Sequence, residues 1–444
     1  GTNAHAQAHG VATAQATGLY DDVATLSGNF VNGTGAVLKG FATAISHNTA
    51  TVTDPTHSYQ HATAIASGGA NAEAFGMRAG YGPYQTIVGG IVSNGSIHAS
   101  AMGNSYNTAT VDVNGPATAR ALGTEDGSYA TAVGVGFDEY VIGGNGGTGI
   151  SYSGTIDAQA IANSDNHAKA TGTSLATADA RGYAAAYAAG TSGYVEYLGG
   201  GYLNKANVAV TALAQVHNQA TAMAGTSLAH ANALEYGSAY AGAVGLNPNI
   251  EFMIGDLVNG TGGSIAVHAT AHVANTAKAT GGTAGDAYAV AYGTAQARAA
   301  GIRLGSYGAL SVSGLISNEG NIDVTAYAGV TNAVTATGGH AATALAIDGF
   351  RASYATAVGF VAAIDSLGGG FSNSGDIRAV ASVNPVDHAE AYGGTMAHAL
   401  AEGAGFANAS GISLAFNPSH PVYGNIENSG QINAAAFASG GNYA

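Results

Sequence analysis

The chain has 444 residues, of which 69 are glycine, 96 are alanine and none is cysteine or tryptophan. Charged residues make up 8% of the chain, against about 25% in an ordinary soluble domain, which argues against an enzyme of this size. The formal net charge is −15 and no segment contains a cluster of basic residues, so nucleic acid is not an expected partner. No apolar run approaches the ~20 residues that a membrane-spanning helix needs.

The first segment, GTNAHAQAHGVATAQATGLY, has the character of the middle of a repeat, and we assign residues 1–29 to a partial N-terminal repeat. The chain begins at Gly1 and not at Met, which predicts that a leader was removed or that the chain is a piece of a longer polypeptide.

One pattern then recurs down the chain, with a branched apolar residue as its pivot. It begins as VSNGSIHASA, SYSGTIDAQA or ENSGQINAAAFA, and successive pivots are 52 to 60 residues apart. The eight pivots are Val37, Ile97, Ile156, Val208, Ile265, Ile322, Ile377 and Ile432. This regularity predicts a single continuous repeat array over residues 1–444.

After each pivot, small or branched apolar residues alternate with more polar ones. The run Ile156, Ala158, Ala160 and Ala162 is an example. A period of two predicts β-strands. The first copy departs from the pattern at Lys39 and Gly40, where we expect a β-bulge.

Between pivots the alternation continues in pieces of about ten residues that end in glycine, such as NAVTATGG and FRASYATAVG. Alanine favours helices intrinsically, but the frequent glycines and the interspersed Thr, Val and Tyr oppose a helix. We therefore expect an all-β chain. A parallel β-solenoid (β-helix) of eight repeats is favoured over an eight-bladed propeller, because alanine-lined strands suit a narrow interior. Each repeat would form one large coil or two smaller ones.

Asparagines precede most pivots. They are Asn94, Asn204, Asn318, Asn373 and Asn428, with Asn32 and Asn259 slightly displaced and Tyr152 replacing one. Stacked at a turn of a solenoid, their amides would form a hydrogen-bonded ladder. Asn-Gly and Asn-Ser-Gly are also good turn formers, which explains the same pattern without a ladder.

The last segment, residues 425–444, is a partial C-terminal repeat that complements the N-terminal one. Joining the two ends leaves 444 − 432 + 37 = 49 residues between pivots, which is close to the internal spacing. Subunits placed head to tail would continue the period, and an end-to-end contact that does not close produces a filament.

No catalytic, cofactor-binding or metal site is expected. Four residues of a strand span about 13 Å, so neither His5 with His9 nor His268 with His272 can chelate one ion, although histidines of different coils could still meet. The acidic pairs Asp21-Asp22, Glu125-Asp126 and Asp138-Glu139 lack the convergent Lys or Arg of a polysaccharide-cleaving site. GGNGGTG at 143–149 lacks the Lys of a phosphate loop. Threonine runs such as residues 49–53 are not repeated in register, as ice binding would require.

The segments SNEGNI, SNSGDI and ENSGQI, with their Ala/Thr/Gly alternation, resemble the β-strand repeats of bacterial autotransporter passengers and related surface proteins. The resemblance implies a secreted, right-handed β-helix that acts in surface structure or adhesion. We therefore expect a structural protein, extracellular or at the cell surface, that polymerises with itself head to tail. The alternative is an adhesin or passenger stalk that does not polymerise, and an enzyme built on the same scaffold ranks third.

Overall fold

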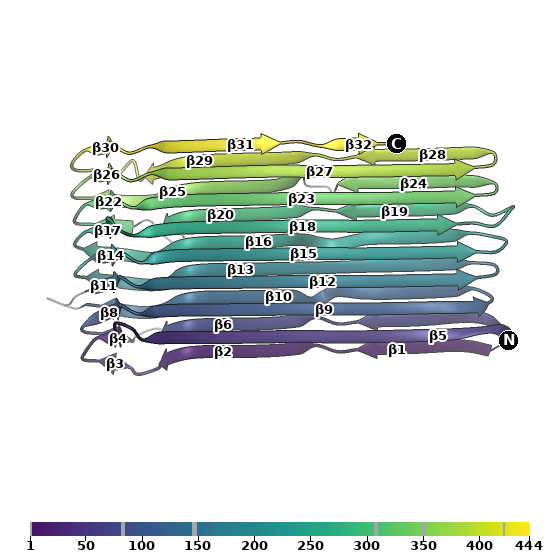
Figure 1. Cartoon of the computed structure of the whole chain (residues 1–444), viewed down its shortest axis with the longest axis horizontal. Coiled ribbons are helices and arrows are strands. Elements are labelled where there is room, and N and C mark those ends of the chain that lie inside the picture. The colour runs from purple at the N-terminus through teal and green to yellow at the C-terminus, as the bar shows by residue number, and fades with distance from the viewer. Residues whose placement is uncertain (1, 81–84, 144–148, 306–309, 349–351, 421) are drawn as a thin grey trace.

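The computed structural model describes residues 2–80, 85–143, 149–305, 310–348, 352–420 and 422–444, without the side chains of 124–126 and 235–238. The described chain is all-β and winds into a solenoid of parallel strands, with its first coil at one edge and its last at the other (Figure 1). The predicted fold class is confirmed. Among the described residues every strand pairing between coils is parallel, with none of the antiparallel pairs that build the blades of a propeller.

Each coil contributes a long forward strand. The forward sheet contains β5 (Val37–Ser67, first part), β9 (Ser96–Asn114), β12 (Thr155–Gly172), β15 (Asn207–Ala224), β18 (Ser264–Thr280), β23 (Asn321–Gly338), β27 (Ile377–Gly393), β31 (Ile432–Ala438) and β32 (Gly441–Tyr443).

The chain then turns and runs back. The return sheet contains β1 (Thr2–His9), β2 (Ala12–Asp21), the second part of β5, β6 (Ala70–Ala79), β10 (Ala117–Ile142), β13 (Ala176–Gly199), β16 (Ala229–Ile254), β19 (Ala287–Gly293), β20 (Ala295–Leu304), β24 (Ala341–Asp348), β25 (Ser353–Leu367), β28 (Met396–Glu402) and β29 (Gly405–Phe416). The shorter β3 (Thr25–Leu26), β7 (Thr86–Ile87) and β21 (Leu310–Val312) extend it.

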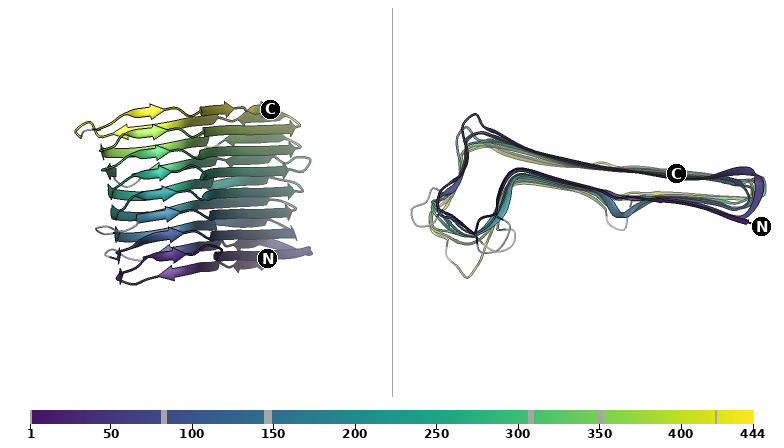
Figure 2. Two further views of the ribbon diagram at one scale, coloured as in Figure 1. Left: turned by 60° about the vertical axis from the view of Figure 1, so that its left-hand side comes forward. Right: turned by 90° about the horizontal axis from the view of Figure 1, so that it is seen from below.

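A third, narrow sheet closes one end of every coil. We call it the end sheet, and its eight short strands lie in coil order. They are β4 (Phe30–Asn32), β8 (Gly90–Ser93), β11 (Gly149–Tyr152), β14 (Tyr202–Asn204), β17 (Leu257–Asn259), β22 (Ile316–Asn318), β26 (Phe371–Asn373) and β30 (Ile426–Asn428). Seen end on, the coil is thin along most of its length and widens at the end sheet (Figure 2).

One repeat forms one large coil, which decides between the two coil lengths that the sequence allowed. Ile97 pairs with Ile156, and each later pivot pairs with the next, through to Ile432. In the first coil the partner of Ile97 is Leu38, and Val37 pairs with Ser96. Val37 is therefore the wrong pivot. Five residues separate Asn32 from Leu38, as five separate Asn259 from Ile265, whereas three residues stand at this place in the other copies.

The expected bulge at Lys39 and Gly40 is also absent, because β5 pairs with β9 in continuous register from Val37 to Asp54. Gly40 faces inward at the place of Ala99 in the next coil. A Cβ at Gly40 would overlap the backbone of Phe75 in the return sheet. Close approach of the two sheets explains this glycine.

The pivots pack against a column of glycines in the return sheet. A Cβ added at Gly134 or Gly245 would overlap the side chain of Ile156 or Ile265, and the same holds in the other coils for Gly76, Gly190, Gly301, Gly359 and Gly411. The branched pivot thus fills the space that the missing Cβ leaves, which locks the two sheets at a fixed offset.

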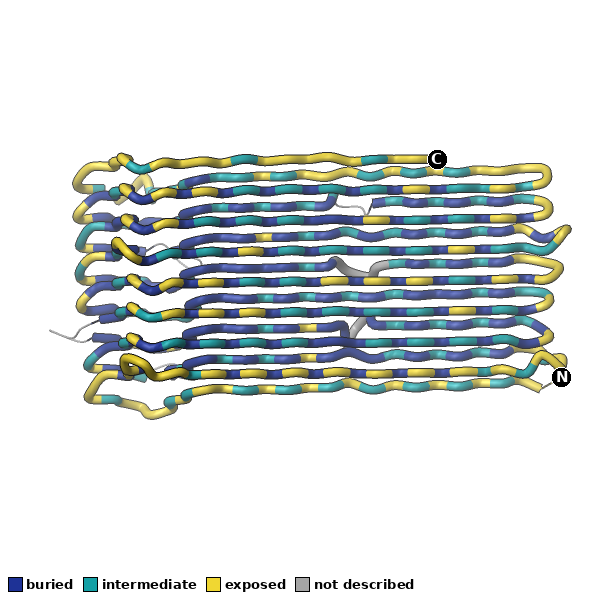
Figure 3. Tube along the Cα trace, in the orientation of Figure 1, coloured by how far each residue is buried: buried dark blue, intermediate teal, exposed yellow. Residues whose placement is uncertain are grey.

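The core is thin, and alternate residues of the long strands face it (Figure 3). Two hydrophobic clusters fill it. The larger cluster lies beside the end sheet and holds the pivots and aromatic residues such as Phe360 and Phe371, whereas the distal one is almost entirely alanine. A polar column described below separates the two clusters.

Candidate functional site

The end sheet carries a ladder of asparagine amides. Asn204 Nδ2 donates to Asn259 Oδ1 at 2.8 Å, and the same bond continues from Asn259 to Asn318 at 2.7 Å, from Asn318 to Asn373 at 2.6 Å and from Asn373 to Asn428 at 2.6 Å. Four of the five asparagines predicted from the sequence are therefore joined in one ladder, and Asn259 is a full member of it.

Asn94 is the exception and is not part of the ladder. Its side chain is exposed and accepts a hydrogen bond from Ser153 Oγ at 2.6 Å. The inward position belongs to Ser93, which pairs with Asn32 on one side and with Tyr152 on the other. The prediction was wrong because neighbouring residues of a strand face opposite sides of the sheet. In the SNG segment Ser93 stands at the position that asparagine holds in most other copies, and Asn94 comes one residue later.

A second asparagine ladder, which the sequence reasoning missed, runs inside the solenoid between the two hydrophobic clusters. In each bond Nδ2 donates to the Oδ1 of the next coil, at distances of 2.7 to 3.0 Å. Its members are Asn48, Asn107, Asn166, Asn218, Asn275, Asn332 and finally Asp387. We call this column the interior ladder.

The interior ladder also bridges the two long sheets. The second N–H of Asn218 donates to Leu234 O at 3.3 Å, and Asn275 and Asn332 make the matching bonds to Tyr292 O and Ile347 O at 3.1 Å. An amide has two donor hydrogens and one carbonyl oxygen, so one side chain serves both neighbouring coils and the opposite sheet. The signal in the sequence was an asparagine ten residues after the pivot.

Asp387 differs from the other members of the interior ladder because its side chain is a carboxylic acid and not an amide. It is fully buried, its Oδ1 accepts from Asn332, and its Oδ2 has no hydrogen-bond partner among the described residues. Burial raises the pKa of Asp387 to about 6. Burial also raises the pKa of Asp348, on the facing return strand, to about 6, and Asp387 adds to that shift by repulsion.

Both ladders have the same polarity. Every Nδ2 donor points toward the C-terminal edge and every Oδ1 acceptor toward the N-terminal edge. At the N-terminal edge, Asn32 Oδ1 has no hydrogen-bond partner among the described residues. At the C-terminal edge, Asn428 Nδ2 donates only within its own turn in the described hydrogen bonds, to Gly430 O at 3.1 Å. The last coil thus carries the donor half of a ladder bond, whereas the unused acceptor oxygen of the first coil is shielded from water.

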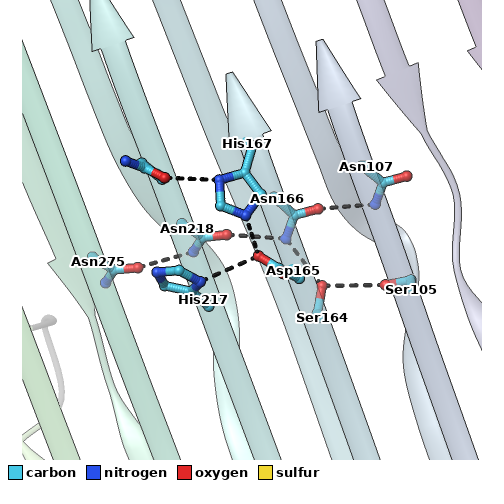
Figure 4. A network of polar contacts seen from close by, with 10 residues as sticks. Ser105, Asn107, Ser164, Asp165, Asn166, His167, His217, Asn218 and Asn275 are labelled. Carbon is cyan, nitrogen blue, oxygen red and sulfur yellow. Dashed lines mark hydrogen bonds and ion pairs between the residues drawn. The ribbon is translucent and has the colours of Figure 1, made fainter. Parts of the chain in front are cut away.

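The outer face of the forward sheet holds a separate cluster (Figure 4). Asp165 Oδ1 lies 2.7 Å from His167 Nε2 and 3.2 Å from His217 Nδ1. Burial opposes ionisation of Asp165, but contacts with the two imidazoles hold the pKa of its carboxyl well below the ordinary value. The contact with Asp165 in turn raises the pKa of His167. The three side chains come from β12 and β15, so histidines of different coils do meet.

The other sequence candidates do not form ligand sets among the described residues. His5 and His9 lie on β1, and His9 Nδ1 is 3.0 Å from Ser67 Oγ. Burial lowers the pKa of His272, and His217 adds to that shift. Burial raises the pKa of Glu139 to about 7, and repulsion from Asp21 and Asp138 adds to it. The side chains of Glu125 and Asp126, and residues 144–148 of the GGNGGTG segment, lie outside the described residues.

Comparison with known proteins found no match: no family model, no curated protein and no solved structure is similar to this chain. The described residues also include no helix long and apolar enough to cross a membrane.

Proposed function

We propose that this protein is a structural β-solenoid that associates with further copies of itself, the C-terminal edge of one copy stacking on the N-terminal edge of the next. The observation that carries the proposal is the single direction of the parallel strand columns, which stop at an open strand edge in the first coil and in the last. The end-sheet ladder follows the same direction and ends in an amide donor, Asn428 Nδ2. Such edges are complementary only when copies stack in the same direction.

Residues that pair with one another from coil to coil form columns, and these columns give the register of the contact between copies. Asn32 and Asn428 occupy the same column of the end sheet, and His5 and His398 occupy one column of the return sheet. In the stacked pair, Asn428 lies next to Asn32 of the next copy in the end-sheet column. Unpaired strand edges supply backbone hydrogen bonds along the rest of the coil.

Burial supports the same contact. The pivot Ile432 in the last coil is 39% exposed, whereas Ile377 one coil earlier is 1% exposed. Most inward residues of the first and last coils are less buried than their equivalents between them (Figure 3). A coil stacked on either edge removes this apolar surface from water, at about 25 cal/mol per Å².

Electron microscopy of the 444-residue protein over a range of concentrations tests the proposal. We expect rods that lengthen with concentration, with an axial repeat of about 38 Å for eight coils at ~4.8 Å each. Ala436→Lys puts a charge on the inward side of the last forward strand and should leave single rods. Ala435→Lys, on the outward side of the same strand, is the control. Circular dichroism checks that both variants fold.

Wild-type rods that stay single at every concentration would contradict assembly and favour the alternative, a stalk or adhesin that does not polymerise. An extracellular or cell-surface location is part of the proposal and follows from the resemblance to bacterial surface repeats. Antibody labelling of intact producing cells tests it. Labelling that appears only after the cells are broken would contradict it.

A further inference from the structure

We propose that Asp165, His167 and His217 form a binding site for one divalent transition-metal ion, of which Zn²⁺ is the best-matched probe. One carboxylate oxygen and one nitrogen from each of two imidazoles converge here, and the ligand atoms all lie within 4.8 Å of one another. Among the described residues this is the only group of three or more such side chains that does so.

The strand register explains why the three side chains meet. Asp165 and His217 are direct cross-strand partners on β12 and β15, and His167 is two residues further along the same face of β12. Figure 4 shows both imidazoles turned toward the carboxylate. Neighbours at positions i and i+2 of one strand, together with the facing residue of the next coil, make a compact three-point site.

The backbone beneath the site is rigid. Asp165 alternates with Ser164 and Asn166, which face inward, and Asn166 is bonded in the interior ladder to Asn107 and Asn218 at 2.9 and 3.0 Å. The same ladder holds β15 beside His217. Ligand positions are therefore set by buried hydrogen bonds on both strands, as an effective metal site requires.

Gln219 orients one of the ligands. Its Oε1 lies 2.9 Å from His167 Nδ1, and an amide oxygen only accepts, so Nδ1 carries the hydrogen. The Nε2 atom, which faces Asp165, is then the ligand atom. A metal-binding histidine commonly donates its other N–H to such a partner, which fixes the tautomer and the ring orientation.

The two distances from the carboxylate oxygen to the imidazole nitrogens are shorter than the ligand separations of a zinc site. Tetrahedral Zn²⁺ with bonds of about 2.1 Å separates its ligands by about 3.4 Å, against 2.7 and 3.2 Å here. Asp165 Oδ1 is shielded from water and receives no well-directed hydrogen bond from the described residues. An ion placed between the three atoms would satisfy that oxygen.

The donor set selects the class of metal. Two imidazole nitrogens with one carboxylate oxygen suit Zn²⁺, Cu²⁺ or Ni²⁺, whereas Ca²⁺ and Mg²⁺ prefer oxygen ligands throughout. The side chains of Asp165, His167 and His217 are 32, 37 and 49% exposed, so the ion would be reached from solvent and would complete its coordination with water. This proposal does not depend on end-to-end assembly.

Calorimetric titration of the metal-free 444-residue protein with Zn²⁺ near neutral pH tests the site. We expect one ion per chain bound more tightly than any other. His217→Ala and Asp165→Asn should each weaken that binding at least tenfold, and Gln219→Ala, which removes only the orienting contact, should weaken it less. These side chains lie on the outer face, so circular dichroism should be unchanged.

The matched control is His98→Ala. His98 Nδ1 lies 3.5 Å from Asp157 Oδ2 on the same sheet, and no third ligand joins this pair within the part of the chain that the structure describes. We expect His98→Ala to leave the tight Zn²⁺ site intact. Weak binding of several ions that declines equally in the His98 and His217 variants would overturn the proposal, and so would no binding at all. Cobalt substitution gives a second readout, because Co²⁺ in a tetrahedral site shows strong visible absorption that the Asp165→Asn variant should lose.

Discussion

Replacing Asp387 with asparagine should make the protein more stable at neutral pH. Asp387 is fully buried in the interior ladder, at the position that asparagine occupies in earlier coils, and its Oδ2 is without a described partner. An amide keeps the oxygen that accepts from Asn332 and removes the charge. The Nδ2 group gained could extend the ladder toward Asn442, the cross-strand partner of Asp387.

The magnitude follows from the pKa of Asp387. Burial raises it from an ordinary 3.8 to about 6. At 1.36 kcal/mol per pKa unit, the ionised form costs about 2 to 3 kcal/mol of folding free energy. The folded chain holds the proton more tightly than the unfolded chain. The stabilisation that comes from this more tightly held proton is therefore complete below about pH 4, and it is lost as the pH rises through about 6.

Thermal unfolding by calorimetry at pH 4, 5, 6 and 7 measures this difference. The Asp387→Asn variant should gain little at pH 4 and about 2 kcal/mol or more at pH 7. Asp323→Asn is the control, because Asp323 is an exposed partner of Arg378 and should change stability little at any pH. A variant less stable than wild type at pH 7, or a gain that is equal at pH 4 and pH 7, would refute the argument.

Three further changes probe the core. Gly245→Ala forces a Cβ into the pivot of the facing strand and should cost about 1 to 3 kcal/mol in chemical denaturation, whereas Gly33→Ala, with no described atom within 4 Å of its Cβ, should cost far less. Asn218→Ala leaves buried amide groups on both sides unpaired and should cost about 2 to 5 kcal/mol, against almost nothing for the exposed Asn94→Ala. Because burial raises the pKa of Glu139 to about 7, Glu139→Gln should raise the melting temperature at pH 8 more than at pH 5, and an equal rise at both would contradict this.

Local pattern predicted much of the fold. The alternation after Ile156 identifies a strand and its inward face, because side chains of a strand alternate between its two faces whatever it packs against. The spacing of the pivots predicted a stacked array for the same reason, since equivalent strands need equivalent positions in each coil. The end-sheet asparagines were visible because they stand close to the pivots in sequence.

Other features depend on contacts between residues 50 to 60 positions apart, which a local pattern does not contain. Only the folded coil shows that Leu38 and not Val37 aligns with Ile97, because the turn after Asn32 is two residues longer than the turn after Ser93. The same holds for the interior ladder, whose asparagines satisfy the opposite sheet as well as one another.

Composition and periodicity alone thus determined an all-β stack of alanine-lined strands with glycine turns. Tertiary structure decided that each repeat makes one coil, that polar ladders run through it in one direction, and that Asp165, His167 and His217 meet on its surface. The physical reason is that alternation acts between adjacent residues of one strand, whereas register and side-chain convergence arise only when separate coils pack together.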